Sequence, residues 1–164
     1  MAFFDEEKPL SNFLKINFLT IKNRKSIYKM STLILYEVAM KKIIASDKAP
    51  KAIGPYSQAV QFGNLVFFSG QLGINPETGK LAEGGVKAQA EQALKNIKAI
   101  LEEAGAYVEN VIKTTIFITK MDDFQDVNAV YSTVFNKDFP ARSCVAVHQL
   151  PLNALVEIEI VVAL

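Results

Sequence analysis

The strict alternation of side chains over Leu155–Ala163 is the feature of this sequence that most restricts its fold. Every second position is β-branched and the positions between are mixed: Val156, Ile158, Ile160 and Val162 alternate with Leu155, Glu157, Glu159 and Val161. Because successive side chains of a strand point to opposite faces of a sheet, this period predicts a strand with one buried face and one mixed face. The fold therefore contains a sheet covered on one side.

Further segments predict the other strands of this sheet. Ser57–Phe62 and Leu65–Gln71 flank Gly63-Asn64, a two-residue turn that favours a β-hairpin. Val111–Thr119 is rich in β-branched residues, which favour strands. Two shorter strands are predicted, at residues 41–44 and at Ser143–Val147.

Two amphipathic segments predict the helices. Val86–Ala104 carries apolar residues at helical spacing, and Gly105 follows as a stop signal. A second helix is predicted from Asp122 to Phe135, with acids at its amino end, where the helix dipole favours negative charge. Its inward-facing residues are expected to be Phe124, Val127, Tyr131, Val134 and Phe135. The order of elements predicts an α+β domain, a mixed sheet with two helices on one face.

Two helices can cover only one face of the predicted sheet. The same alternation places Val66, Phe68, Ile112, Ile116 and Ile118 on the covered face and Leu65, Phe67, Phe117 and Val161 on the other. This uncovered face is too apolar to remain fully in water, because exposed apolar patches of that kind usually mark interaction sites. We therefore expect a homo-oligomer.

Composition narrows the classes of function. The 164 residues carry a formal net charge of +1, and no basic stripe interleaved with aromatics follows Met40, so nucleic acid is not an expected partner. The single Cys144 and the single His148 exclude an intrachain disulfide and a thiol–imidazole zinc cluster, so no metal is expected. No run of about 20 apolar residues is present to span a bilayer, so no membrane partner is expected. A reducing cytoplasm is the expected location.

The first 39 residues differ in character from the rest. They contain six basic and four acidic residues and no glycine, and they precede a Met40 that resembles a natural start. We interpret residues 1–39 as an N-terminal extension, either an upstream leader or the product of a start codon assigned too early, and residues 40–164 as the domain. Asp5, Glu6 and Glu7 disfavour a transit peptide, because such peptides are poor in acids, and interrupting basic residues disfavour a secretory signal.

Near the end of the domain, the segment Phe139–Val145 places Arg142 where apolar residues are expected. A guanidinium binds a planar carboxylate through two parallel hydrogen bonds and does not lose its charge. Alternation predicts that Arg142 and Cys144 lie on the uncovered face with Glu157, opposite Val145 and Val147, which would belong to the helix-covered core.

With the hydroxyls of Tyr56 and Ser69, these groups suffice for a small anionic substrate and an activated water. Each residue also has a structural interpretation. Arg142 is as well suited to an ion pair with Glu157 or Glu159, Cys144 to a buried apolar position, Tyr56 to packing in a turn and Ser69 to a local hydrogen bond.

Five segments carry distinctive strings: Ile53-Gly54-Pro55-Tyr56-Ser57-Gln58-Ala59, Phe68-Ser69-Gly70-Gln71, Asp123-Phe124 with Val127-Asn128, Pro140-Ala141-Arg142-Ser143-Cys144-Val145, and Val156-Glu157-Ile158-Glu159. Together and in this order they resemble the RidA family, also called the YjgF family, over about Lys41–Leu164. The resemblance implies a chorismate-mutase-like α+β fold. It also implies a homotrimer whose sheets form a central barrel, with active sites between subunits.

The resemblance further implies an enamine/imine deaminase that needs no cofactor. Such enzymes hydrolyse 2-aminoacrylate, 2-iminopropanoate and 2-iminobutanoate to 2-keto acids and ammonia, which protects pyridoxal-phosphate enzymes from damage. Arg142 would bind the substrate carboxylate, backbone groups of Cys144 would position the imine nitrogen, and Glu157 would hold or deprotonate the attacking water. The implied pocket is completed by Tyr56, Ser69 and Asn128.

Two other functions stay open from the sequence. A ribonuclease or translation-inhibitor activity is also attributed to the family, although the net charge gives it little support. A non-catalytic trimer that binds a ligand or acts as a chaperone would use the same clefts without turnover.

Overall fold

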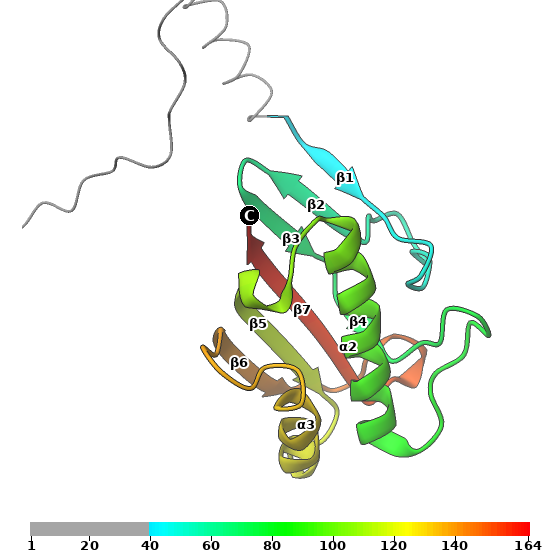
Figure 1. The fold of residues 1–164 in the computed structure, drawn as a ribbon. Coiled ribbons are helices and arrows are strands. Elements are labelled where there is room, and N and C mark those ends of the chain that lie inside the picture. The colour runs from blue at the N-terminus through cyan, green and yellow to red at the C-terminus, as the bar shows by residue number, and fades with distance from the viewer. Residues whose placement is uncertain (1–39) are drawn as a thin grey trace, which may run out of the picture. The chain divides into compact units, whose positions relative to one another are not determined.

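A computed structural model describes residues 40–164, and the predicted extension at residues 1–39 lies outside the described residues. The sheet has the strand order β1-β2-β3-β7-β5-β6, and β4 also pairs with β7 (Figure 1). Its strands are β1 (Lys42–Ile44), β2 (Ala59–Phe62), β3 (Leu65–Phe68), β4 (Gln71–Leu72), β5 (Val111–Ile118), β6 (Ala141–Ala146) and β7 (Val156–Ala163). The sheet is mixed, because β6 runs parallel to β5 while the other pairs are antiparallel.

The predicted hairpin is present as β2 and β3, which pair in antiparallel register around the turn. Gly63 adopts a φ of 62°, the left-handed conformation that a two-residue hairpin turn requires. The second strand of the hairpin ends earlier than predicted, at Phe68. Ser69 and Gly70 lie outside the strands, and β4 then continues the pairing with β7.

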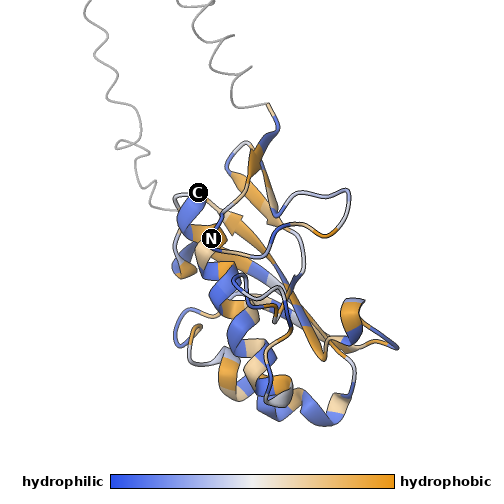
Figure 2. Ribbon diagram, turned by 90° about the vertical axis from the view of Figure 1, so that its right-hand side faces the viewer, coloured by the Kyte–Doolittle hydropathy of each residue, from blue (hydrophilic) through white to orange (hydrophobic). Residues whose placement is uncertain are grey.

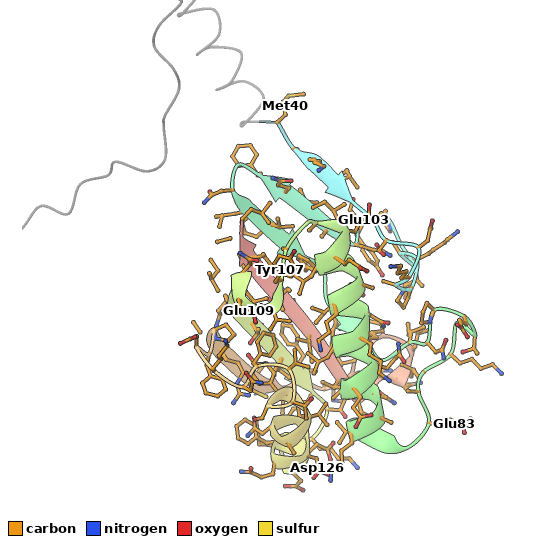
Figure 3. The ribbon with its side chains drawn as sticks, viewed as in Figure 1. Met40, Glu83, Glu103, Tyr107, Glu109 and Asp126 are labelled. Atoms are coloured by element: carbon orange, nitrogen blue, oxygen red, sulfur yellow. The ribbon has the colours of Figure 1, made fainter. Side chains whose placement is uncertain are left out.

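The two predicted helices lie on the same face of the sheet. They are α2 (Gly85–Glu103) and α3 (Phe124–Tyr131), and α3 follows the short 3-10 helix η3 (Met121–Asp123). Figure 3 labels Glu103 at the end of α2 and Asp126 on α3, and an ion pair of 3.1 Å joins Asp126 to Lys87 at the start of α2. The second helix is shorter than predicted, since turns follow Tyr131, but Phe135 is still buried beyond it.

The alternation in β7 is confirmed. Its four β-branched residues at even positions are at most 1% exposed, and the intervening residues are partly buried. The covered face packs against apolar side chains of both helices, including Leu94, Ile97 and Val127. Figure 2 shows hydrophobic colour along the strands and mixed colour along the helices, as expected for amphipathic helices that cover a sheet.

The predicted alternation in β5 is wrong at its first two residues. Val111 is 5% exposed and Ile112 is 47% exposed, whereas Ile112 was expected to face the core. The register with β7 shifts between Val111 and Lys113, so Ile112 is an extra residue in the strand. A bulge of this kind reverses the alternation on one side of it, while Ile116 and Ile118 beyond it are buried as predicted.

The uncovered face carries the apolar residues expected there. Phe67 is 48% exposed, and Leu65, Phe117 and Val161 are partly buried. Two further short helices complete the described part, η2 (Val108–Asn110) and η4 (Pro151–Asn153). Within residues 40–164, no helix combines the length and the apolar character needed to cross a membrane.

Candidate active site

Arg142 lies on the helix-covered face of the sheet, at its edge. The parallel register pairs Arg142 with Thr114 and Cys144 with Ile116, and both partners on β5 are fully buried beneath the helices. Paired residues on neighbouring strands point to the same face, so Arg142 and Cys144 point toward the helices. The prediction that they share the uncovered face with Glu157 is therefore wrong.

The valines that alternate with Arg142 and Cys144 are also placed differently from expectation. Val145 pairs with Phe117 on the uncovered face and is 43% exposed, and Val147 packs in a small separate cluster with Leu72 and Leu150. The prediction that the side chains of this strand alternate between two faces was correct, but the faces were assigned the wrong way round. Every residue of β6 is exposed or partly exposed, so its burial pattern carries no signal for either face.

The side chain of Arg142 is held by one stripe of α3. Its Nη1 donates a hydrogen bond of 2.8 Å to Asn128 Oδ1. Its guanidinium carbon lies 4.8 Å from the ring centroid of Tyr131 and 5.7 Å from that of Phe124, within the range of cation–π attraction. Tyr131 is fixed in turn by a hydrogen bond of 3.0 Å between its Oη and Thr114 Oγ1.

Arg142 has no carboxylate partner among residues 40–164. The ion pairs in this part of the chain join Lys48 to Glu102 and Lys87 to Asp126. A structural ion pair of Arg142 with Glu157 or Glu159, the simplest alternative for this arginine, is therefore absent from the described residues. One amide oxygen and two ring faces hold the guanidinium, which leaves further N–H donors available to an anion.

The backbone beside Arg142 is open on one side, because β6 is the last strand of the sheet. Val147 N–H donates to the Ile118 carbonyl, at 2.8 Å, and strand alternation then directs the N–H and C=O groups of Cys144 away from β5. The Cys144 thiol is partly buried against the core, and this burial raises its pKa. The side chain is thus suited to packing, and the free backbone groups are the ones able to bind a ligand.

Glu157 lies on the opposite face of the sheet, where it pairs with Phe117 and Leu72. Its carboxylate opens into a hollow of about 300 Å³. The residues that line this hollow are Ile53, Tyr56, Ser69, Gly70, Leu72, Pro151 and Glu157. Burial is the main cause that raises the pKa of Glu157, and the charge of Glu159 adds to it. A carboxyl with a raised pKa in a partly apolar hollow is suited to proton transfer.

Tyr56 and Ser69 reach the hollow from segments that are fixed by local hydrogen bonds. Ser69 Oγ donates to the Ser57 carbonyl at 2.7 Å, and Tyr56 Oη accepts from Ile53 N–H at 3.3 Å. The buried Gln58 side chain anchors the preceding loop, since its amide donates to the Pro50 carbonyl at 2.8 Å. These contacts match the local structural roles considered for both residues, and they also hold both side chains at the hollow.

Buried polar groups on α2 hold the segment around β4, whose Leu72 lines the hollow, and the residue before β7. Asn96 is 1% exposed, and its amide donates to the carbonyls of Leu72 at 3.1 Å and Ile74 at 2.9 Å. Gln89 accepts from Leu155 N–H at 2.8 Å, just before β7. These bonds explain why a helix that faces an apolar core carries amides there.

The structure thus divides the predicted site residues into two groups. Tyr56, Ser69 and Glu157 line one hollow, and Arg142, Cys144 and Asn128 lie together on the other face. Within residues 40–164, no group of three or more His, Cys, Asp or Glu side chains is arranged to hold a metal ion.

Sequence reasoning missed the platform beneath the arginine. Phe124 and Tyr131 were assigned to the core and do pack there, but both rings also lie beside the guanidinium of Arg142. Phe124, Asn128 and Tyr131 stand at positions i, i+4 and i+7, which fall on one stripe of a helix. That spacing was a usable signal. The apolar walls of the hollow, Ile53 and Pro151, had no comparable signal.

Comparisons with known proteins agree with this architecture. A family model described as Endoribonuclease L-PSP matches residues 46–164. The 2-iminobutanoate/2-iminopropanoate deaminase of Escherichia coli is 50% identical over 123 residues, which cover 73% of this chain and 95% of the relative.

Solved structures show the same fold. The crystal structure of RidA from the Antarctic bacterium Psychrobacter sp. has a TM-score of 0.73 and 47% identity, over 75% of this chain and 99% of that one. The structure of Escherichia coli TdcF with bound serine has a TM-score of 0.72 and 44% identity, over 75% and 98% of the two chains. The chain is therefore a member of the RidA family, to which the Endoribonuclease L-PSP model corresponds.

Proposed function

We propose that this protein is a deaminase that hydrolyses 2-aminoacrylate, 2-iminopropanoate and 2-iminobutanoate to 2-keto acids and ammonia. The observation that carries the proposal is the state of Arg142, a guanidinium held by Asn128 and two rings without a carboxylate partner in residues 40–164. The deaminase name of relatives at about half identity supports the same activity. Hydrolysis of these reactive enamines and imines would protect pyridoxal-phosphate enzymes from attack by them.

Arg142 binds the substrate carboxylate through its remaining N–H donors. Charge-assisted hydrogen bonds of this type contribute about 1.5–3 kcal/mol each. The open carbonyl of Cys144, two residues along the same strand edge, accepts a hydrogen bond from the imine nitrogen. Serine bound to the TdcF relative has the same combination of carboxylate and nitrogen on one small carbon skeleton, which supports this class of ligand.

Glu157 activates the water in this mechanism. The carboxylate takes a proton from water as the oxygen bonds to the imine carbon, and the C=N electron pair moves to nitrogen. Glu157 then returns this proton to nitrogen, which gives a neutral carbinolamine. As the C–N bond breaks, Glu157 takes the hydroxyl proton and passes it to the same nitrogen, so that a 2-keto acid and ammonia leave. The imine carbon is already electrophilic, so orientation and one base suffice without a cofactor. An enamine substrate first gains a proton at its terminal carbon and loses one from nitrogen, which converts it to the isomeric imine.

The complete site requires a second copy of the chain. Arg142 and Glu157 point to opposite faces of one sheet, so a single small substrate does not reach both within one chain. A homotrimer with the sheets around a central barrel brings the β6 edge of one copy against the hollow of the next. The open edge of β6 and the exposed Phe67 and Val145 support such an assembly.

The test is a coupled assay with a pyridoxal-phosphate-dependent serine dehydratase. Adding the full-length protein is expected to accelerate the release of pyruvate and ammonia from the enamine. Arg142→Ala should lower kcat/KM by about 10²–10⁴, because two charge-assisted hydrogen bonds are lost. Lys98→Ala is the control, since it removes an exposed cation from α2. Full acceleration by Arg142→Ala would refute the carboxylate-binding role.

The same protein preparation distinguishes the deaminase from the two other functions. The ribonuclease alternative rests on the description of the family model, and it predicts cleavage of RNA that falls with added salt. A non-catalytic binder predicts heat on titration with a 2-keto acid but no acceleration of the dehydratase reaction. Acceleration without RNA cleavage is the result expected of the deaminase.

A further inference from the structure

Gly70 lies between β3 and β4, directly against the side chain of Glu157. A Cβ atom added to Gly70 would contact the Glu157 carboxylate, with Cδ at 2.6 Å and Cγ at 2.8 Å. Real Cβ atoms essentially never approach other heavy atoms within 3.0 Å. Glu157 therefore occupies the space that any other residue at position 70 would fill with its own side chain.

The need for glycine here is one of space and not of backbone conformation. Gly70 is not among the described glycines with positive φ, which are Gly63, Gly79, Gly84, Gly85 and Gly105. The three atoms nearest to the added Cβ all belong to the side chain of Glu157. An alanine at this position is consequently compatible with the fold, provided that the carboxylate moves.

Gly73, three residues later, has a different role. A Cβ there would lie 2.5 Å from both Cα and the carbonyl oxygen of Gln89, which belong to the backbone of α2. Backbone cannot rotate away, so Gly73 permits the close approach of the helix to the sheet. Gly73 is therefore needed for the fold itself, whereas Gly70 is needed only to leave room for the Glu157 carboxylate.

We propose that Gly70 is a positioning residue for the reaction, because its missing side chain defines the place of the Glu157 carboxylate in the hollow. This inference rests on the proposed function, in which Glu157 activates the water. Leu72 pairs with Glu157 on β7, and Tyr56 and Pro151 line the hollow around them. Because Gly70 has no side chain, it leaves the space that the Glu157 carboxylate occupies beside the hollow.

The charges around this carboxylate are few. Glu159 is the neighbouring acid on the same face of β7, and the uncharged residues Tyr56 and Ser69 line the same hollow. No basic side chain lines the hollow in the described residues. Within one chain the position of the carboxylate is therefore set by packing and not by an ion pair, and a single methyl group is enough to change it.

Gly70→Ala displaces the carboxylate but leaves Arg142 untouched on the other face. A shift of about 1 Å in a reacting group costs about a hundredfold in rate. The variant is thus expected to lose about a hundredfold in kcat with KM nearly unchanged. A merely structural role of Gly70 would instead lower the amount of folded protein and leave the kcat of the folded fraction as it was.

Gly54→Ala is the matched control. Its added Cβ would meet only the Tyr56 ring, at 3.5 Å, an ordinary van der Waals distance, so kcat is expected to stay close to that of the wild type. The double variant Gly70→Ala with Glu157→Asp supplies a rescue, because aspartate is one methylene shorter and withdraws from the new methyl group. Its kcat is expected to exceed the product of the two single effects.

A second measurement does not depend on activity. The side-chain carboxyl of Glu157, assigned by its loss in Glu157→Gln, is titrated by ¹³C NMR in full-length wild type and in Gly70→Ala. Displacement toward solvent is expected to return the pKa of Glu157 toward its ordinary value in the variant, because burial is the main cause that raises it.

The outcomes are separable. An unchanged titration of Glu157 in Gly70→Ala, or a kcat equal to that of Gly54→Ala, overturns the positioning role. A wild type that does not accelerate the dehydratase reaction refutes the proposed function, and the NMR comparison still decides whether Gly70 places the carboxylate.

Discussion

Arg142 and Glu157 lie on opposite faces of one sheet, although their strands β6 and β7 both flank β5. The guanidinium points toward α3, and the carboxylate points into the hollow on the uncovered face. Within one chain the proposed anion-binding group and the proposed base are therefore separated by the sheet itself. This separation leads to a test of how the site is assembled.

Two inactive variants are expected to restore each other. In mixed oligomers of Arg142→Ala and Glu157→Gln chains, a site between subunits takes Arg142 from one chain and Glu157 from the other. Random mixing gives about one quarter of sites with both groups intact, and activity should return to about that level. The measurement is the dehydratase-coupled assay after co-refolding, with each variant refolded alone as the control. A site within one chain would recover nothing.

Asn128 is expected to tune the affinity for substrate through Arg142. Asn128→Ala removes the acceptor of the 2.8 Å hydrogen bond, so the guanidinium loses its orientation and KM rises, by about tenfold. Asn128→Asp places a carboxylate against Arg142 that competes with the substrate, and its KM should rise further. Steady-state kinetics of both variants tests this order, which a role in packing alone would not produce.

The hydrogen bond between Tyr131 and Thr114 is expected to stabilise the fold more than it affects activity. Tyr131→Phe keeps the ring beside Arg142 but leaves the fully buried Thr114 hydroxyl without its partner, a cost of about 1–3 kcal/mol in the free energy of unfolding. The double variant with Thr114→Val should cost less than the sum of the single changes. Denaturant unfolding measures both, and additive losses would contradict the pairing.

Glu157 is expected to destabilise the folded protein at neutral pH. Its pKa is raised above the ordinary 4.5, so the folded state holds a proton that the unfolded state has already lost, and the free energy of unfolding falls as pH rises through that window. Glu157→Gln should therefore be more stable than wild type at pH 7, with the difference vanishing below pH 4.5.

Thermal unfolding across this pH range is the measurement, with Glu91→Gln, an exposed change on α2, as the control. Glu157→Gln also removes the proposed base, so the kcat of this variant should fall by about 10²–10⁴. Equal stability of Glu157→Gln and wild type at every pH would show that the carboxylate carries no burial cost.

Much of the fold was predictable because its signals are local. The hairpin around Gly63, the helix over 86–104 and the burial pattern of β7 each follow from a period or a turn within a few residues. The bulge at Ile112 was not predictable, because an extra residue is visible only in the pairing with β7. The early end of the second helix was not predictable either. The turns after Tyr131 still bury Phe135, so the apolar pattern continues beyond the last helical residue.

The sequence by itself indicated the polar residues of the candidate site and determined the presence of one covered sheet face, because residue type and period are local properties. Only the tertiary structure decided on which face Arg142 and Cys144 lie. An edge strand that is exposed on both sides shows no burial period, so its phase is set by the register of β6 against β5. This register places Arg142 and Glu157 on opposite faces of the sheet. The site expected on one face is therefore divided into two halves, which do not meet within a single chain.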